Sequence, residues 1–388
     1  MTTATVTLLT KTGQVADMND LISSTFGFIP VIVSGDENAR LIKVGATEYV
    51  RVIGSGLVMT GVQPTGGTIR KIELVQDSDQ GMQVRGTVTL SGGAWDFSEF
   101  YSASFRDTLA ATAMTIQDGA GDDRIIASDL ADTVTWKAGG GSINVGGGDD
   151  LLIMHTLKRG VAGPEIMLFG DEGRDTLRVT NGLGAQGVLD LGKIFMTGFE
   201  RFVLAAKAEL RLGADSFESS RLGEDASFQL AKGATLTIVS SGAPEIDLQG
   251  QTIAGPGRVQ VVGKASEDIL TGNAASRDLL LGGGDRDVLS GLGGAGTLNG
   301  GTGNDRLTGG EGRDVFVFAR AGGMDVITDF AGDVIDLRGM DGVTGLADLK
   351  KNHARNVGED VVLRFGQGDQ LVLEGVSKAE LKADFFLF

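Results

Sequence analysis

The sequence contains no cysteine and few of the residues that most often catalyse reactions or bind transition metals. Its 388 residues include 2 His, 5 Pro and no Cys. Without cysteine, the chain has no disulfides, thiolate metal sites or cysteine nucleophiles. The two histidines, His155 and His353, lie far apart in the sequence, so the His-Glu-x-x-His helix of zinc proteases is absent. A metalloprotease is therefore excluded.

Several other patterns are missing. There is no Gly-x-Ser-x-Gly, which disfavours a lipase, and no Gly-x-x-x-x-Gly-Lys-Ser/Thr, which leaves phosphate binding unsupported. No run approaches the ~18 apolar residues of a membrane span. A net charge of -17 argues against binding to nucleic acid or anionic membranes. The first residues lack the basic and apolar regions of a cleavable signal peptide. We expect a protein that is cytosolic or exported without such a signal.

Glycine, by contrast, is abundant. The chain has 62 Gly, about double the average usage of roughly 7%, and no collagen period. This composition favours repetitive β structure with many tight turns. Because 41% of the residues are hydrophobic, acidic disorder of the whole chain is disfavoured.

A nine-residue pattern, Gly-Gly-x-Gly-x-Asp-x-U-x with U a large apolar residue, repeats between Gly263 and Val317. Two blocks, Gly300 to Thr308 and Gly309 to Val317, match it in full. One upstream block has Gly296 in place of the aspartate, and Gly272 is a single inserted residue. The four upstream blocks run from Gly263 to Thr271, Asn273 to Leu281, Gly282 to Ser290 and Gly291 to Asn299.

Each position of the repeat has a physical role. The apolar residue points inward from a very short strand, because side chains alternate between faces. Glycines allow turns with positive φ and leave backbone carbonyls accessible, and the aspartate supplies the hard anionic oxygen that calcium prefers. The predicted core residues are Leu270, Leu280, Leu289, Leu298, Leu307 and Phe316.

This part of the chain resembles the RTX, or haemolysin-type calcium-binding, family. From about Asp314 onward it also looks like the C-terminal domain of serralysin-type proteases and type I secretion substrates, through Asp325 to Phe330, Ile335 to Leu337 and Asp384 to Phe388. The resemblance implies an all-β fold with a parallel β-roll or β-helix that binds several Ca2+ ions. It also implies export, to the cell exterior or surface, by a type I secretion apparatus that recognises an uncleaved C-terminal signal. The link from Phe330 to Asp333 is shorter than is usual in that family.

If two blocks make one coil, each ion lies between blocks n and n+2. Asp268 then pairs with Asp287, and Asp287 with Asp305. Asp278 and Asp314 each face Gly296, so we expect fewer ions, or more weakly bound ions, on that side. The predicted metal ligands of this region are Asp268, Asp278, Asp287, Asp305, Asp314, Asp325, Asp329, Gly282, Gly284, Gly300, Gly303, Gly309 and Gly312.

A degenerate form of the repeat occupies residues 118 to 178. The same rule pairs Asp132 with Asp150 and places Asp123 opposite Gly141, and a single later block contributes Asp175. These four aspartates are also predicted metal ligands.

The remaining segments lack the repeat but keep short apolar runs that are typical of strands. Residues 1 to 115 are expected to form a β-rich module with one helix from Asp96 to about Ala113, capped by Asp96. Residues 179 to 262 are expected to form irregular coils of the same solenoid, with a separate β-sandwich as the alternative. The predicted division is 1–115, 116–178, 179–262, 263–317 and 318–388.

No catalytic motif is found, which predicts a non-enzymatic extracellular protein that self-associates into a surface layer, sheath, filament or matrix. The alternative is a carbohydrate-active enzyme or glycan-binding adhesin, since β-helices can present carboxylates and a basic residue on one face. Acids outside the repeat, such as Glu165, Glu200 and Glu245, are better explained as turn or surface residues. A toxin is disfavoured because no membrane-inserting run precedes the repeats.

Overall fold

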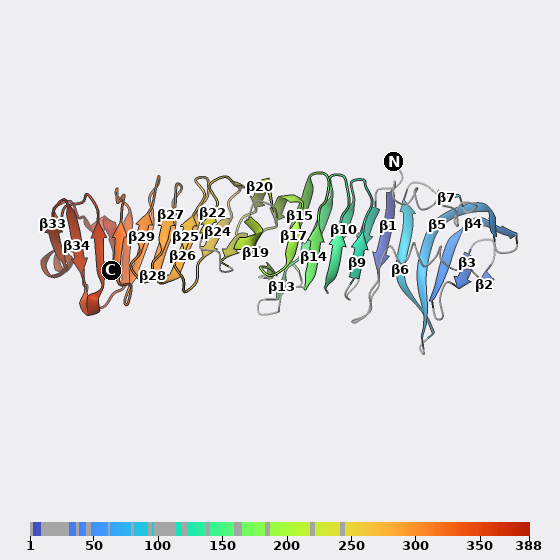
Figure 1. The fold of residues 1–388 in the computed structure, drawn as a ribbon, viewed down its shortest axis with the longest axis horizontal. Helices are drawn as coiled ribbons and strands as arrows, with labels where there is room; N and C mark the ends of the chain where they lie inside the picture. The colour runs from blue at the N-terminus through green and yellow to red at the C-terminus, as the bar shows by residue number, and fades with distance from the viewer. Residues whose placement is uncertain are drawn as a thin grey trace. The chain divides into compact units, whose positions relative to one another are not determined.

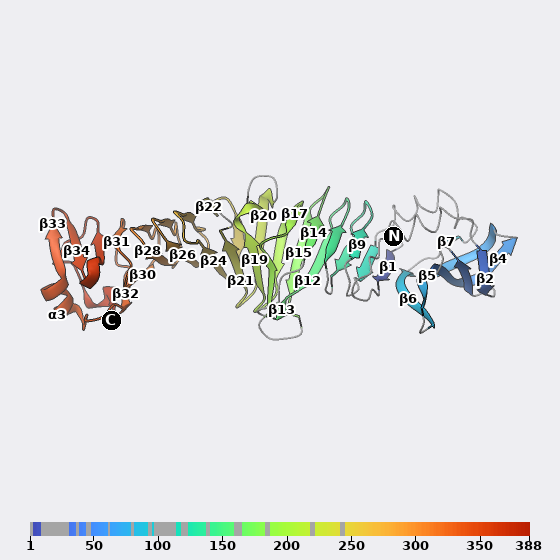
Figure 2. The same cartoon turned by 60° about the horizontal axis from the view of Figure 1, so that its bottom comes forward.

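The computed structural model describes residues 3–8, 31–35, 39–43, 48–60, 63–78, 81–91, 95–96, 114–117, 123–136, 140–158, 165–182, 187–217, 222–240 and 245–388. The chain forms two compact units. Unit 1 comprises Met1–His155, Val161–Thr180 and Ile194–Phe202, and unit 2 comprises Thr156–Gly160, Asn181–Lys193 and Val203–Phe388. Among the described residues, both units consist mainly of strands (Figure 1 and Figure 2).

The N-terminal part of unit 1 is an antiparallel sheet of long strands. Its order is β2-β3-β4-β5-β6-β1, with the short strand β7 paired to β5. Asp96 therefore lies in a strand and does not cap a helix, and the rest of the predicted helix lies outside the described residues. The strands are β1 (Thr3–Leu8), β2 (Val31–Gly35), β3 (Ala39–Lys43), β4 (Glu48–Thr60), β5 (Gln63–Ser78), β6 (Gly81–Ser91) and β7 (Trp95–Asp96).

The other part of unit 1 consists of parallel coils. One sheet stacks β8 (Met114–Gln117), β10 (Thr133–Thr135), β12 (Leu151–His155) and β15 (Asp175–Thr180), and β1 joins it to the antiparallel sheet. A second parallel sheet contains β9 (Asp123–Ile126), β11 (Gly141–Asn144), β14 (Ile166–Phe169) and β17 (Phe195–Thr197). In both sheets one apolar residue per coil is buried in register with the next, as in Ile116, Val134, Leu152 and Leu177.

Unit 2 contains two longer parallel stacks. The first runs β16 (Gly187–Leu191), β19 (Glu209–Gly213), β21 (Thr235–Val239), β24 (Arg258–Val262), β26 (Asp278–Gly284), β28 (Thr297–Thr302), β30 (Val315–Ala319), β32 (Val334–Gly339) and β36 (Phe386–Leu387). The second contains the parallel strands β22 (Glu245–Asp247), β25 (Ile269–Thr271), β27 (Val288–Ser290), β29 (Arg306–Thr308), β31 (Met324–Ile327) and β35 (Gln370–Leu373), and it ends in the antiparallel strands β34 (Asp360–Arg364) and β33 (Ala354–Val357).

The remaining elements complete the description. They are the strands β13 (Leu157–Lys158), β18 (Phe199–Leu204), β20 (Leu222–Leu230) and β23 (Thr252–Ala254), the 3-10 turns η2 (Ala214–Phe217), η4 (Gly366–Gly368) and η5 (Ala383–Phe385), the short helix α3 (Leu346–Asp348) and the π-helical turn η3 (Leu349–His353).

The predicted core of the repeats is confirmed, and the register divides it into two columns. Leu280 pairs with Leu298 and Leu298 with Phe316 in the first stack. Leu270, Leu289 and Leu307 are in register in the second. All six side chains are at most 1% exposed, which is the arrangement expected when alternate coils contribute to opposite sheets.

The irregular coils and the repeats share one sheet. Val261 of β24, before the first repeat, pairs in parallel with Leu280 of β26, within it. At the other end of the stack, Phe386 is 5% exposed and pairs with Ile335 of β32. The all-β, parallel β-roll fold class predicted from the sequence is confirmed.

Candidate metal centre

Aspartates of alternate blocks form a column along unit 2, each at the start of a short strand. The backbone N–H of Asp268 donates to Oδ1 of Asp287 (2.9 Å), and that of Asp287 to Oδ1 of Asp305 (2.9 Å). The N–H of Asp305 donates to Oδ1 of Asp325 (3.0 Å), which extends the column by one coil. All four side chains are buried. The structure therefore brings together the aspartates that the n and n+2 rule pairs.

A second column, on the other sheet, is interrupted by glycine. The N–H of Gly296 donates to Oδ1 of Asp314 (2.7 Å), and the N–H of Asp314 to Oδ1 of Asp333 (3.0 Å). On its other side Gly296 lies beside Asp278, so one coil lacks a carboxylate. Sequence reasoning missed Asp333, because the nine-residue frame ends at Val317.

Unit 1 has its own column. The N–H of Asp132 donates to Oδ1 of Asp150 (2.5 Å), and that of Asp150 to Oδ1 of Asp175 (2.9 Å). The N–H of Asp175 then donates to Oε2 of Glu200 (2.8 Å). Glu200 lies in strand β18 and continues the column, so its assignment to a turn or the surface is wrong. Asp123 pairs with Gly141 in the backbone register, as predicted, and its side chain is outside the described residues.

In most of these aspartates one carboxylate oxygen is left over. Six of them are buried with an oxygen that has no hydrogen-bond partner among the described atoms: Asp150, Asp175, Asp268, Asp287, Asp305 and Asp314. A buried polar oxygen without a partner destabilises a fold, and a carboxylate does so more than a neutral group. A cation at each of these oxygens would remove that cost.

The first glycine of a block lies against this free oxygen. A Cβ at Gly309 would come within 2.7 Å of Oδ2 of Asp314, and a Cβ at Gly282 or Gly300 would also collide with the aspartate of its own block. Glycine thus keeps space open beside the carboxylate. The residues present fit a cation bound at this position.

The other predicted glycines have different roles. Gly303 (φ 146°) and Gly312 (φ 133°) adopt a backbone conformation that L side chains rarely reach, and a Cβ at either would collide with a carbonyl of the preceding coil. These two positions require glycine for backbone reasons. Gly284 lies in β26 with an ordinary φ, and a Cβ there would meet Oγ1 of Thr302 at 3.3 Å.

Burial and mutual repulsion disfavour ionised aspartates in the columns. Desolvation raises the pKa of Asp287 to about 7, with further contributions from Asp305 and Asp268. Desolvation also raises the pKa of Asp150 to about 8, that of Asp325 to about 8 and that of Asp314 to about 6. A divalent cation would reverse this balance because it favours the ionised form.

Three aspartates differ, because serine-containing loops bind their carboxylates. Asp132 accepts the N–H (2.6 Å) and hydroxyl of Ser128, and Asp278 accepts the N–H of Asn273 (2.5 Å) and the hydroxyl of Ser276. Asp268 accepts the N–H of Lys264 (2.9 Å) and, at 3.4 Å, the hydroxyl of Ser266, both on Oδ2, so its Oδ1 still has no partner. Each is the first aspartate of its column. We call 128–132, 264–268 and 273–278 the serine-closed loops, and those before Asp150, Asp175, Asp287, Asp305 and Asp314 the open loops.

Two further carboxylates lie at the C-terminal end of unit 2. Asp329, a predicted ligand, accepts the N–H groups of Gly309 (2.9 Å) and Gly310 (2.8 Å), one on each oxygen. Asp369 accepts those of Ala321 (3.1 Å) and Gly323 (3.2 Å) and is buried. No sequence pattern pointed to Asp369, because it lies in a segment without the repeat.

Side chains alone do not complete a metal site in the part of the chain that the structure describes. No group of three or more His, Asp or Glu side chains there is arranged to hold an ion. Calcium takes 6–8 oxygen ligands, many of them backbone carbonyls. An ion at an open loop would therefore need carbonyl oxygens of the glycine turns in addition to the aspartates.

None of the described helices is long and apolar enough to cross a membrane.

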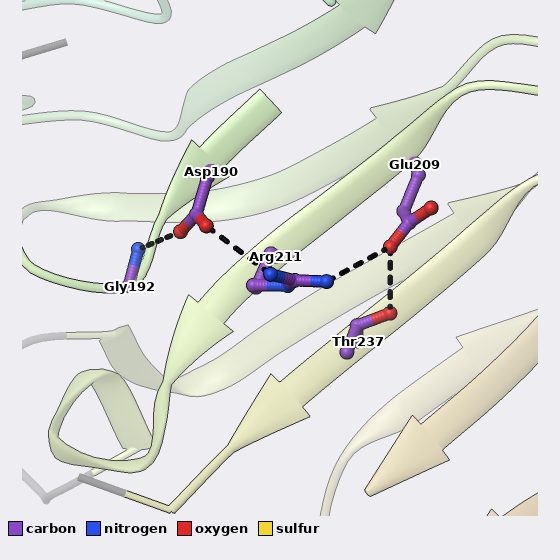
Figure 3. A network of polar contacts seen from close by, with 5 residues as sticks. All are labelled: Asp190, Gly192, Glu209, Arg211 and Thr237. Carbon is purple, nitrogen blue, oxygen red and sulfur yellow. Dashed lines mark hydrogen bonds and ion pairs between the residues drawn. The ribbon is translucent and has the colours of Figure 1, made fainter. Parts of the chain in front are cut away.

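A separate polar network lies on the coils between residues 179 and 262. Arg211 of β19 forms ion pairs with Asp190 (3.4 Å) and Glu209 (3.6 Å), and Glu209 accepts the hydroxyl of Thr237 at 3.4 Å (Figure 3). The arginine thus compensates both carboxylates of this network. The arrangement links three neighbouring strands of the first stack of unit 2.

The fold and the aspartate columns define an all-β parallel β-roll. No family model matches the chain, and no curated protein matches its sequence. Among solved structures it is similar to the extracellular lipase LipA from Serratia marcescens, with 16% identity and a TM-score of 0.31. The match covers 75% of this chain and 47% of the lipase, so the chain spans about half the length of that protein.

This comparison corrects one prediction. The expectation of a non-enzymatic protein is contradicted, because the similar solved structure is an enzyme. That expectation was based on the absence of known catalytic motifs. A motif search detects only the types of reaction for which a sequence motif is known. Lipase activity is a property of the Serratia protein.

Proposed function

We propose that this chain is a secreted RTX-type protein whose open loops bind Ca2+ and whose β-roll folds outside the cell when they do. The observation that carries the proposal is the set of buried aspartates that each keep one oxygen without a partner. Hard carboxylate oxygens beside glycine turns are the ligands that calcium prefers.

Within this proposal each atom of the column has a task. The oxygen that accepts the N–H of the preceding coil fixes the carboxylate, as in Asp287 and Asp305. The other oxygen is left to bind the ion, and the first glycine of the block leaves the space for it. Calcium supplies the positive charge that keeps neighbouring buried carboxylates ionised together.

The same arrangement couples folding to the environment. Where calcium is scarce, the columns bring buried carboxylates close together and disfavour the folded roll. At the millimolar calcium found outside cells, binding free energy becomes folding free energy, because the site does not exist in the unfolded chain. A chain that must cross an export channel unfolded would benefit from this order of events.

Export by a type I secretion apparatus through the C-terminal segment belongs to this proposal, as does association with further copies. The hydrophobic end from Asp384 to Phe388 motivates the first. The parallel stacks motivate the second, because the open edge of a terminal coil can pair with another strand, and contacts that do not close produce filaments or layers.

Equilibrium dialysis against calcium tests the binding itself. The purified chain should bind several Ca2+ ions per molecule in a buffer that contains excess Mg2+, because the open loops offer flexible oxygen ligands that suit the larger ion. Loss of all binding when magnesium is present would contradict the proposal. A variant with Asp150, Asp287 and Asp305 replaced by Asn should bind fewer ions than the parent chain.

A further inference from the structure

A groove of about 510 Å³ lies on the first stack of unit 2, beside the network of Figure 3, because its lining residue Thr235 is the register partner of Glu209. It crosses four neighbouring strands, β21, β24, β26 and β28, or the turns that precede them. Thr235 and Arg258 are register partners within it. The pairing of Val259 with Asp278 places Arg258 next to Arg277 on the adjoining coil. Two arginines thus stand side by side, about one strand spacing apart, or roughly 4.8 Å.

These two arginines have no acidic partners. Among the described residues, neither guanidinium of Arg258 and Arg277 makes a salt bridge or a hydrogen bond, although both side chains are exposed. Some other arginines of unit 2 are paired with carboxylates, as in Arg306 with Glu374 (3.1 Å) and Arg338 with Asp336 (2.6 Å). Unpaired cations beside each other repel, so this groove holds positive charge that the rest of unit 2 does not neutralise.

The groove also lacks an exposed carboxylate. Its one acidic lining residue is Asp278, which is 3% exposed and whose oxygens accept the N–H of Asn273 and the hydroxyl of Ser276. In a chain with a net charge of -17, a groove with two cations and no exposed anion is a local reversal of sign. That reversal favours an anionic ligand.

The remaining lining favours a sugar polymer over other anions. Gly233 and Gly257 line the groove without side chains. The hydroxyls of Thr235 and Thr297 can form hydrogen bonds with sugar hydroxyls. Three strand spacings give the groove a length of roughly 14 Å along the stack, which suits an extended chain more than a single small ion. No aromatic side chain lines it, so the platform on which single-stranded nucleic acids stack their bases is missing.

We propose that this groove binds an acidic polysaccharide, with Arg258 and Arg277 each pairing with a carboxylate or sulfate of the sugar chain. Guanidinium groups match such anions through two parallel N–H bonds, and these charge-assisted bonds are stronger than neutral ones. The binding site is separate from the open loops and goes beyond the proposed calcium-dependent folding.

Isothermal titration calorimetry with the full chain in calcium, at moderate salt, tests this inference. The ligands are oligogalacturonate and a neutral maltooligosaccharide of equal length. Oligogalacturonate should bind, the neutral sugar should not, and affinity for the former should fall as NaCl rises. The Arg258→Gln, Arg277→Gln double variant should lose at least about tenfold in affinity, whereas the matched control Lys351→Gln, Arg364→Gln should not change.

Three results would overturn the inference. They are equal binding of the neutral sugar, unchanged affinity of the Arg258→Gln, Arg277→Gln variant, and tighter binding of single-stranded DNA or of inorganic sulfate than of oligogalacturonate. Circular dichroism of every variant in calcium confirms that the roll is folded. A failure of this groove is therefore distinguishable from a failure of calcium-driven folding.

Discussion

Asp278 and Asp287 are both buried at the start of a repeat strand, yet their carboxylates are satisfied differently. Asp278, in a serine-closed loop, accepts the N–H of Asn273 and the hydroxyl of Ser276. Asp287, which follows an open loop, keeps Oδ2 without a partner. The difference teaches that hydrogen bonds within a loop can satisfy a buried aspartate without a cation, as at Asp278, and that Asp287 has no such bonds to its second oxygen. The loops of Asp132 and Asp278 close on their own hydrogen bonds, whereas the loop of Asp268 and the open loops each leave one carboxylate oxygen without a partner.

This comparison suggests an order of assembly. The serine-closed loops at Asp132 and Asp278 can form at low calcium and then present a finished coil edge to the next block. Each open loop is then added with its ion on an existing template. Propagation on a preformed edge avoids repeating the entropic cost of nucleation, as in other repeat folds.

The largest effect is expected from removing an open-loop carboxylate in the uninterrupted column. Asp287→Ala takes the side chain from a coil with aspartates on both sides, whereas Asp314→Ala takes it from a coil next to Gly296. In a calcium titration followed by circular dichroism, the folding midpoint should rise by at least about tenfold for Asp287→Ala and by less for Asp314→Ala. Equal shifts would show that the pairing of blocks is wrong.

The next effect concerns the space beside the free oxygen. Gly300→Ala places a Cβ against the carboxylate of Asp305, so the ion position should be blocked while the aspartate remains. We expect weaker calcium binding and a lower melting temperature in calcium. The free energy of unfolding should decrease by about 1–3 kcal/mol. Gly366→Ala is the matched control, because a Cβ there meets nothing within 4 Å. If both variants bind calcium like the parent chain, Gly300 is not needed to leave space for the ion beside Asp305.

The pH dependence should differ in sign with and without calcium. Burial raises the pKa of Asp287 to about 7 and of Asp150 to about 8, from an ordinary 3.8. At a pH between the ordinary pKa and the raised pKa, the folded, calcium-free chain binds more protons than the unfolded chain. The stability of the calcium-free fold should therefore decrease as the pH rises from about 4 to about 8. Calcium needs the ionised carboxylates, so the stabilisation it gives should grow over the same window.

Melting curves of calcium-depleted protein, recorded at about pH 5 and about pH 8 with and without added calcium, check this prediction. Calcium should raise the melting temperature much more at the higher pH. A calcium effect that is as large at about pH 5 as at about pH 8 would mean that the column aspartates are not the ligands.

The smallest effect is expected from a serine-closed loop. Ser276→Ala removes the hydroxyl that bonds Asp278 and should destabilise the roll by about 1 kcal/mol. The number of bound calcium ions should stay the same, because this loop does not depend on an ion. Ser290→Ala in β27 makes the same chemical change away from these carboxylates and serves as the control. A lower calcium stoichiometry in Ser276→Ala alone would remove the distinction between the two kinds of loop.

The parts that followed from the sequence are those where a strict nine-residue frame determines the register. Once two blocks make a coil, Asp287 must lie between Asp268 and Asp305, and the leucines must align in columns. Where the nine-residue frame is interrupted, the sequence pattern does not determine which residues are in register. Glu200 and Asp333 join the columns from segments whose spacing is irregular, so only the folded register reveals them.

Other features depend on contacts that no local pattern encodes. The closure of the first loops requires a serine near the aspartate and no repeat coil before it, and the second condition is a property of the stack. The groove with Arg258 and Arg277 arises because two arginines nineteen positions apart become neighbours across coils. The non-enzymatic prediction was wrong because it rested on missing motifs, which are not determined by the fold.

The central claim is that ions at the open loops drive folding of the roll, and far-ultraviolet circular dichroism of calcium-depleted protein tests it most directly. The chain should show a clearly weaker β signal in EGTA, because the aspartate columns of the described residues lie in the parallel coils and not in the antiparallel sheet of unit 1. It should gain the rest cooperatively when calcium, but not magnesium, is added in excess of the chelator. The same β signal with and without calcium would contradict the account.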